Sequence, residues 1–295
     1  MIQTKRIGVV SSALSTDPRQ ASRLSRQFGF GGVLLDIRSA TLNIPELSIT
    51  GRRELQHIIS SQQQTLIGLQ MDLGPKGLSQ GSDIDRQITM IDRAMEATAG
   101  VAARVLCVEL GPLPTWPAAA RPRPAISPRD AGVIIIPSMS SAPPEAAPIK
   151  PPDPSFVSQV NEVLSEIGRR ADRYSVMLAF SSSLAGFASL EKTIRDARCP
   201  WFGIDLDPVS ILRDEWNEDE VFSAIGGLIC HVCARDAIVV DKRTKPAVIG
   251  QGNVDWPRFL SRLDEAGYNG FVTIDPNELP DRSRVAVAGL KYLQS

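Results

Sequence analysis

The sequence lacks a surplus of charge of either sign. Its 295 residues include 32 Lys and Arg against 33 Asp and Glu, for a net charge of −1, and the basic residues form no stripe. Proteins that bind nucleic acid need clustered Lys and Arg to neutralise phosphates. We therefore expect no nucleic-acid partner.

Long apolar runs are also missing, and cysteines are few. No stretch approaches the roughly 18 apolar residues that span a membrane, and residues 1–6 contain no apolar segment like that of a signal peptide. Four cysteines in a chain of this length do not suggest a disulfide framework. We expect a cytoplasmic protein with no membrane partner.

Short apolar runs alternate with helical patterns along the chain, which favours βα units and a parallel sheet. Helical spacing is clear at Ile84, Ile88, Ile91 and Met95, with Asp83 as the expected N-cap. The chain is long enough for a (β/α)8 barrel, which takes about 250 residues. The predicted fold class is α/β, a (β/α)8 TIM barrel, with strands over residues 7–11, 32–37, 65–72, 104–110, 176–181, 201–206, 228–233 and 270–274.

Residues 112–154 interrupt this alternation. They hold 13 of the 22 prolines, and proline removes backbone donors and disfavours helix. We expect a single domain over residues 1–295, with this segment as an irregular insertion that is mobile or laid across the barrel mouth. A linker between two four-stranded domains is the alternative, and the run 132–136 is a candidate for a short extra strand.

Polar residues follow most of the expected strands, where barrel active sites lie. Alternation along the seventh strand places His231, Cys233 and Arg235 on one face and Cys230 on the other, so the Cys-x-x-Cys pair is a poor metal motif. A hydrogen-bonded core histidine is the alternative interpretation of His231. The candidate residues at the strand ends are Asp36, Arg38, Asp72, Glu109, Ser181, Asp207, His231, Arg235, Asp236 and Asp275.

Four short motifs in the second half of the chain carry a resemblance. They are Leu178-Ala-Phe-Ser181, Asp207-Pro-Val-Ser210, His231-Val-Cys-Ala-Arg235-Asp236 and Thr273-Ile-Asp275. In order and context they are similar to the strand ends of the xylose-isomerase-like (β/α)8 barrels, a family of sugar phosphate isomerases and epimerases. The resemblance implies a divalent ion held by two Glu, one Asp and one His, with the two Glu moving a proton next to a sugar carbonyl.

The chain departs from that pattern at several positions. Ser181 stands where the family has a Glu, Cys233 replaces a second His, and Asp275 is a shorter carboxylate than the usual Glu. Serine is a weak ligand for a hard dication and cannot serve as a carboxylate base. The metal ligands that the resemblance still implies are Asp207, His231 and Asp275, so we expect a divalent metal (Mn, Mg or Zn) to bind weakly or not at all.

The resemblance also implies catalytic and binding roles. We expect Asp275 to be the catalytic base, with Glu109, or Glu145 from the proline-rich segment, as a replacement carboxylate. The expected substrate-binding residues are Arg38, Ser181 and Arg235, the two arginines acting as anion clamps, and Asp236 is expected to pair with Arg235. The turn Gly250-Gln-Gly-Asn253 either cradles a phosphate or simply leads into the next helix, and we favour the turn.

The function predicted from these residues is that of a sugar or sugar-phosphate isomerase/epimerase acting by proton transfer next to a carbonyl. Two alternatives stay open. One is a catalytically inactive barrel that binds a carbohydrate-like ligand or a protein partner. The other is a lyase or hydrolase that uses the residual Asp/His/Asp site. The expected partner is a small-molecule sugar or sugar phosphate, and a homo-oligomer is open.

Overall fold

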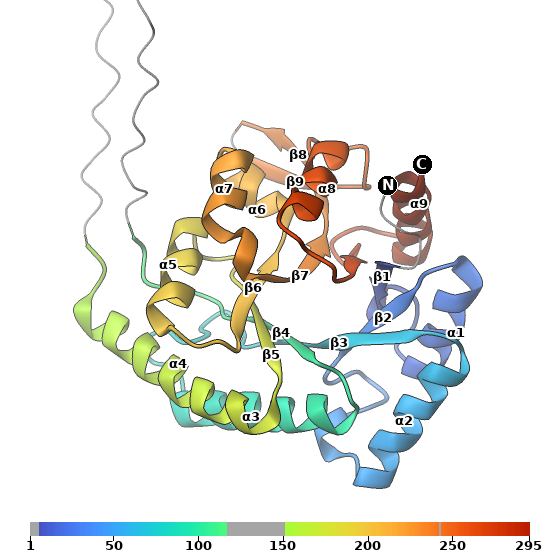
Figure 1. The fold of residues 1–295 in the computed structure, drawn as a ribbon, viewed down its shortest axis with the longest axis horizontal. Helices are drawn as coiled ribbons and strands as arrows, with labels where there is room; N and C mark the ends of the chain where they lie inside the picture. Colours follow the sequence, from blue (N-terminus) through green and yellow to red (C-terminus); the bar gives the residue numbers. More distant parts are fainter. Residues whose placement is uncertain (1–5, 117–150, 242) are drawn as a thin grey trace, which may run out of the picture.

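Eight parallel strands close into one barrel (Figure 1). The structure is a computed structural model that describes residues 6–116, 151–241 and 243–295. Around the barrel the order is β1, β10, β7, β6, β5, β4, β3, β2, which confirms the predicted (β/α)8 fold. The strands are β1 (Ile7–Val10), β2 (Gly32–Asp36), β3 (Thr65–Asp72), β4 (Val105–Glu109), β5 (Met177–Ser181), β6 (Phe202–Leu206), β7 (Ile229–Ala234) and β10 (Val272–Ile274).

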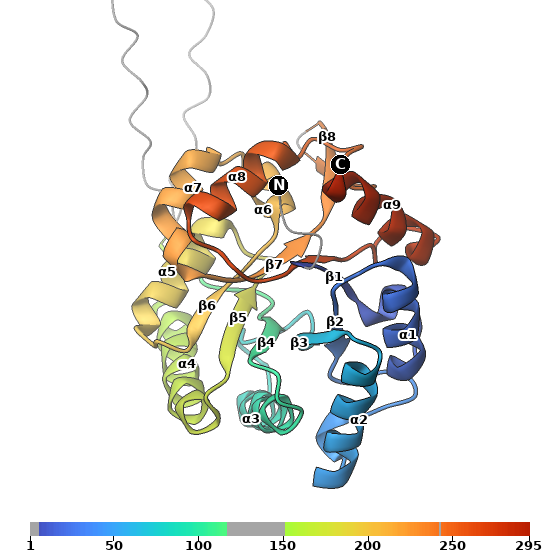
Figure 2. The ribbon, with the colours of Figure 1, turned by 45° about the vertical axis from the view of Figure 1, so that its right-hand side comes forward.

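Helices surround the barrel on its outside, as Figures 1 and 2 show from two directions. The longer helices bury apolar side chains on their inner face; in α3, for example, Ile91 and Met95 are fully buried. The expected N-cap at Asp83 is present, since its carboxylate accepts a hydrogen bond from the Arg86 N–H at 3.0 Å. The helices are α1 (Pro18–Phe28), α2 (Ile49–Ser61), α3 (Ile84–Gly100), α4 (Pro154–Tyr174), α5 (Phe187–Ala197), α6 (Pro208–Arg213), α7 (Glu218–Ile225), α8 (Trp256–Glu265) and α9 (Arg282–Gln294).

The two strands that flank the proline-rich segment pair directly with each other. In the register of β4 and β5, Leu106 lies opposite Leu178, so the segment connects neighbouring strands of one barrel. Its described ends are anchored. The Trp116 N–H donates to the Ser189 hydroxyl at 3.0 Å, and the Gln80 side-chain amide donates to Asp153 at 3.1 Å. Residues 117–150 lie outside the described residues, and with them the predictions of a loop across the mouth, of a strand at 132–136 and of a role for Glu145.

A two-stranded antiparallel hairpin, β8 (Asp236–Val240) and β9 (Arg243–Ala247), follows β7 and lies outside the barrel. The sequence analysis did not predict it. None of the helices in the described ranges is long and apolar enough to cross a membrane.

The Asp236 carboxylate fixes the connection from this hairpin to α8. Asp236 is 3% exposed, and it accepts four backbone N–H bonds, two of them from Gly250 at 2.9 Å and Gly252 at 3.3 Å. The indole N–H of Trp256 donates to it as well, at 3.0 Å. The expected pairing of Asp236 with Arg235 is therefore wrong. The glycine-rich segment is a turn whose N–H groups already bind an anion of the chain itself.

We expect Asp236→Ala to be strongly destabilising. It leaves five donors without their acceptor, and each unsatisfied buried group costs about 1–3 kcal/mol. A loss of more than about 3 kcal/mol in the free energy of unfolding should follow, measured by urea denaturation. Asp264→Ala, at an exposed position of α8, is the control and should change stability by less than about 0.5 kcal/mol. Equal effects of the two substitutions would contradict the role given to Asp236.

Candidate active site at the barrel mouth

A cavity of about 240 Å³ lies at the carboxyl ends of the strands. A second cavity of about 190 Å³ adjoins it and shares Asp207, Arg235 and Asp275 as lining residues. Since side chains alternate along a strand, the polar residues that reach the cavity come from every second position. The titratable residues lining the larger cavity are Asp36, Asp72, Cys107, Glu109, Asp205, Asp207, Arg213, Cys233, Arg235 and Asp275.

Glu109 supplies a carboxylate beside the position where Ser181 stands. The two residues are opposite each other in the register of β4 and β5, and the Ser181 hydroxyl donates to Glu109 Oε2 at 3.0 Å. The Ser183 N–H donates to the other oxygen, Oε1, at 2.8 Å. The structure therefore brings the predicted residues Glu109 and Ser181 together, with Glu109 held in place by neutral donors.

Arg235 and Asp207 form an ion pair at the border of the two cavities. The Arg235 Nε donates to Asp207 Oδ2 at 2.9 Å, and its Nη1 donates to Glu278 at 2.6 Å. The nearby charge of Asp207 raises the pKa of the Arg235 guanidinium. The other oxygen of Asp207 caps α6 by accepting the Val209 N–H at 2.9 Å. Both oxygens of Asp207 are thus engaged by the protein.

Asp275 lines both cavities and carries a perturbed carboxyl group. Burial removes water from the charged form and raises the pKa of Asp275 above its ordinary value of 3.8. The Asn277 N–H, which donates to Asp275 Oδ1 at 2.9 Å, and the charge of Arg235 oppose this rise only in part. Asp275 is therefore the cavity carboxyl whose protonation lies closer to neutral pH than usual.

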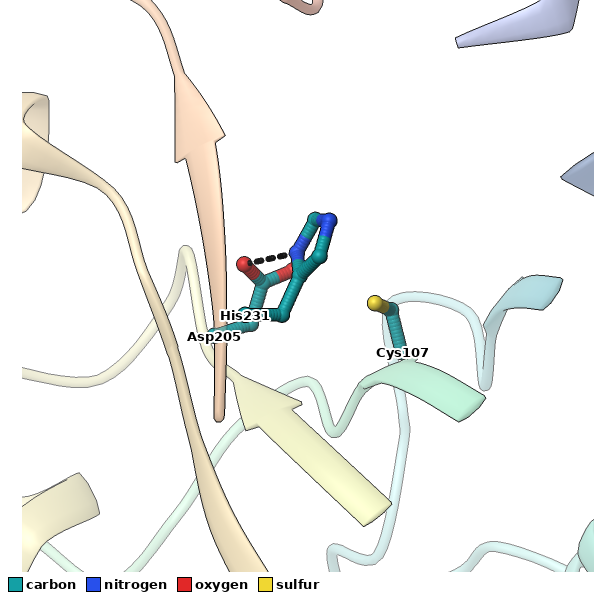
Figure 3. A group of neighbouring side chains, drawn as sticks. All are labelled: Cys107, Asp205 and His231. Carbon is teal, nitrogen blue, oxygen red and sulfur yellow. Dashed lines mark hydrogen bonds and ion pairs between the residues drawn. The ribbon is translucent and has the colours of Figure 1, made fainter. Parts of the chain in front are cut away.

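His231 is 1% exposed and lies beside Asp205, as Figure 3 shows. Its Nδ1 is 2.7 Å from Asp205 Oδ1, and its Nε2 is 2.9 Å from Thr273 Oγ1. These contacts match the alternative interpretation of a hydrogen-bonded core histidine.

The expected metal ligands Asp207, His231 and Asp275 do not come together. Among the described residues, the one group of three or more His, Cys, Asp or Glu side chains close enough to share a metal ion is Cys107, Asp205 and His231. His231 precedes the cavity-lining Cys233 by two residues, so its side chain belongs to the layer below the mouth.

Arg38, the remaining predicted residue, is exposed on the loop after β2 and is not among the residues that line either cavity. Several residues that do shape the site were missed. Arg213 ends α6 and Ser183 lies in the loop after β5, so neither follows strand periodicity. Glu278 reaches the site through its ion pair with Arg235. Asp205 could have been found, because it precedes Asp207 by two residues and so shares its face.

Comparison with known proteins identifies the family to which this barrel belongs. The sequence profile described as "Xylose isomerase-like TIM barrel" matches residues 23–295, so the chain belongs to that family. No curated protein matches the sequence.

Solved structures agree with this barrel fold. A xylose isomerase domain protein from Planctomyces limnophilus superposes with a TM-score of 0.69 at 14% identity, covering 98% of this chain and 95% of its own. D-psicose 3-epimerase with D-tagatose, from Clostridium cellulolyticum H10, gives 0.68 at 13% identity with 98% of both chains covered. IOLI protein with a zinc atom gives 0.67 at 14% identity, with 98% of this chain and 95% of its own covered.

The mouth residues do not fit the metal that the family implies. Arg235 occupies one oxygen of Asp207, Ser181 offers no carboxylate, and the His231 side chain lies in the layer below, grouped with Cys107 and Asp205. A hard divalent ion prefers several charged or carbonyl oxygens around one point. At the mouth, the guanidinium of Arg235 already takes the place of a cation beside Asp207.

The raised pKa of Asp275 predicts how the free energy of unfolding depends on pH. Because its folded pKa lies above the unfolded value of 3.8, the fold is favoured by the neutral carboxyl, and that stability is lost as the pH rises through the folded pKa. Asp275→Asn, which is neutral throughout and keeps the acceptor for Asn277, should therefore be more stable than the wild type at neutral pH.

The advantage should shrink as the pH falls towards about 3, below the unfolded pKa. Urea unfolding midpoints across this pH range measure it, with the exposed cavity residue Asp72→Asn as the control for loss of one carboxylate. A stability difference that stays constant with pH would refute the raised pKa.

Proposed function

We propose that the chain is a sugar isomerase or epimerase that moves a proton on and off the carbon next to a carbonyl. One observation carries the proposal: Asp275 and Glu109, from opposite parts of the barrel, line the same cavity at its mouth. Family membership and the neighbouring D-psicose 3-epimerase support a sugar as the substrate.

Asp275 is the proposed catalytic base. General acid–base catalysis works best when the pKa of the group approaches the working pH, and burial moves the pKa of Asp275 in that direction. Its Oδ1 is held by the Asn277 N–H, which fixes the carboxyl towards the cavity. Glu109, oriented by Ser181 and Ser183, is the second proposed carboxyl and returns the proton.

Arg235 and Ser181 are the proposed substrate-binding groups. Arg235 is held by carboxylates on two sides, Asp207 and Glu278, so its guanidinium lies fixed beside the cavity. There it can donate to a carbonyl or hydroxyl oxygen and stabilise the negative charge that develops when the proton leaves. Arg38 stays a prediction, as do a cytoplasmic location and a homo-oligomer.

The proposed reaction uses no step through a metal. We propose that Mn, Mg or Zn binds weakly or not at all at the mouth, because the carboxylate expected at Ser181 is missing and Asp207 is paired with Arg235. In metal-dependent proton transfer the ion polarises the carbonyl; here that role falls to Arg235.

Exchange of substrate hydrogen with deuterated water tests the proposal. The wild type, incubated with a panel of ketoses and their phosphates, should incorporate deuterium at the carbon next to the carbonyl, followed by NMR. Asp275→Asn should lower the exchange rate by at least about 100-fold, as expected for a lost general base, with binding largely kept. The cavity-lining control Asp72→Asn should retain most of the rate.

A catalytically inactive barrel that binds a sugar is the second candidate. The serine at position 181 and the ion pair that occupies Asp207 favour it, because both remove groups that the family pattern supplies. Calorimetric binding of a sugar without any exchange, and no gain from the double variant Ser181→Glu, Asp275→Glu, would establish this candidate and overturn the isomerase proposal.

A further inference from the structure

The base of the cavity holds a second cluster of ligating side chains, separate from the mouth. Cys107 comes from β4, Asp205 from β6 and His231 from β7, and their sulfur, oxygen and nitrogen atoms all lie within 4.8 Å of one another. Figure 3 shows the Cys107 thiol pointing across the barrel towards the Asp205–His231 pair. We propose that this cluster is a binding site for a thiophilic divalent metal ion such as Zn²⁺.

The donor set is of the kind that zinc selects. Structural and catalytic zinc sites use Cys sulfur, His nitrogen and Asp oxygen, whereas Mg²⁺, Ca²⁺ and Mn²⁺ favour oxygen ligands. A thiolate, a carboxylate and a neutral imidazole together carry two negative charges, which cancel the charge of the ion. This neutrality matters because the three side chains are buried or nearly so, and an uncompensated buried charge is costly.

The hydrogen bonds around His231 are compatible with ligation. Thr273 Oγ1, 2.9 Å from Nε2, can accept the single ring proton and so orient the imidazole. Nδ1, now 2.7 Å from Asp205 Oδ1, then presents its lone pair to an ion that replaces the hydrogen between them. The imidazole keeps one proton, on Nε2, and the Cys107 thiol proton leaves to solvent.

The required movements are small. Ligand atoms around a tetrahedral zinc lie about 3.3–3.8 Å apart, given metal–ligand bonds of about 2.0–2.3 Å. The nitrogen and oxygen must therefore separate slightly, and the sulfur must approach from a distance of no more than 4.8 Å. Rotation of the Cys107 and Asp205 side chains can supply such shifts without moving the strands.

The cluster has an entry path and an open fourth position. Cys107 and Asp205 both line the mouth cavity, as does Cys233, so an ion can reach them through it. The fourth ligand is then a water in the cavity. The site lies one layer below the mouth residues Asp207 and Asp275, so the two positions can be tested separately.

Cobalt is a suitable probe because Co²⁺ replaces Zn²⁺ and absorbs when bound to thiolate. We expect the purified full-length chain to take up one Co²⁺ and to show a thiolate-to-cobalt charge-transfer band, which Zn²⁺ then removes by displacement. Cys107→Ser should abolish the band, and His231→Gln should weaken Co²⁺ binding at least about 10-fold. Cys199→Ser, at a half-buried thiol outside the cluster, is the matched control and should leave the band unchanged.

The mouth provides the contrasting variant. Asp275→Asn should leave the cobalt band in place, since Asp275 is not in the cluster. Absence of a thiolate band in the wild type, or its persistence in Cys107→Ser, would overturn the proposal. Uptake of Co²⁺ without a thiolate band and its loss in Asp275→Asn would place the metal at the mouth instead, and would equally overturn it. Circular dichroism of each variant checks that the barrel is folded.

Discussion

The alternation of side chains along the barrel strands is the constraint on which this site depends. On β4, β6, β7 and β10, an inward residue near the strand end is followed two positions later by another at the mouth. The lower layer holds Cys107, Asp205, His231 and Thr273, and the upper layer holds Glu109, Asp207, Cys233 and Asp275. The barrel thus stacks one polar layer on another, and the two layers differ in chemistry.

The upper layer differs from the family pattern because Arg235 supplies a positive charge among its carboxylates. Its guanidinium pairs with Asp207 and Glu278 and lies beside Asp275. A fixed positive charge at this point neutralises carboxylates that would otherwise repel one another or call for a metal ion. Burial then keeps Asp275 easier to protonate than an exposed aspartate. Acid–base chemistry with a protein cation is the consequence that we propose.

The four residues named for the lower layer include no Lys or Arg, and two of them, Cys107 and His231, are softer ligands than a carboxylate. His231 is held at both nitrogens, and burial raises the pKa of the Cys107 thiol beside it. The residues that the sequence suggested as one metal site are therefore divided between two layers. The role of His231 depends on its hydrogen-bond partners on the adjacent strands, Asp205 and Thr273. The short sequence motif around His231 does not reveal these partners.

The sequence by itself determined the barrel, because apolar runs of strand length and helical stripes such as Ile91 and Met95 depend only on local periodicity and burial. It also located Glu109, Ser181 and Asp275 at strand ends, since alternation and the barrel rule suffice for that. Only the tertiary structure decided which strand ends face each other and at what depth. The register of Asp205 with His231, the five donors gathered on Asp236 and the ion pair of Asp207 with Arg235 join residues 14 or more positions apart, except for the Ala237 donor next to Asp236. The pairings between β6 and β7 arise from assembly of the barrel, and those of Asp236 arise from folding of the hairpin and its connection onto α8. No local pattern in the chain encodes either kind.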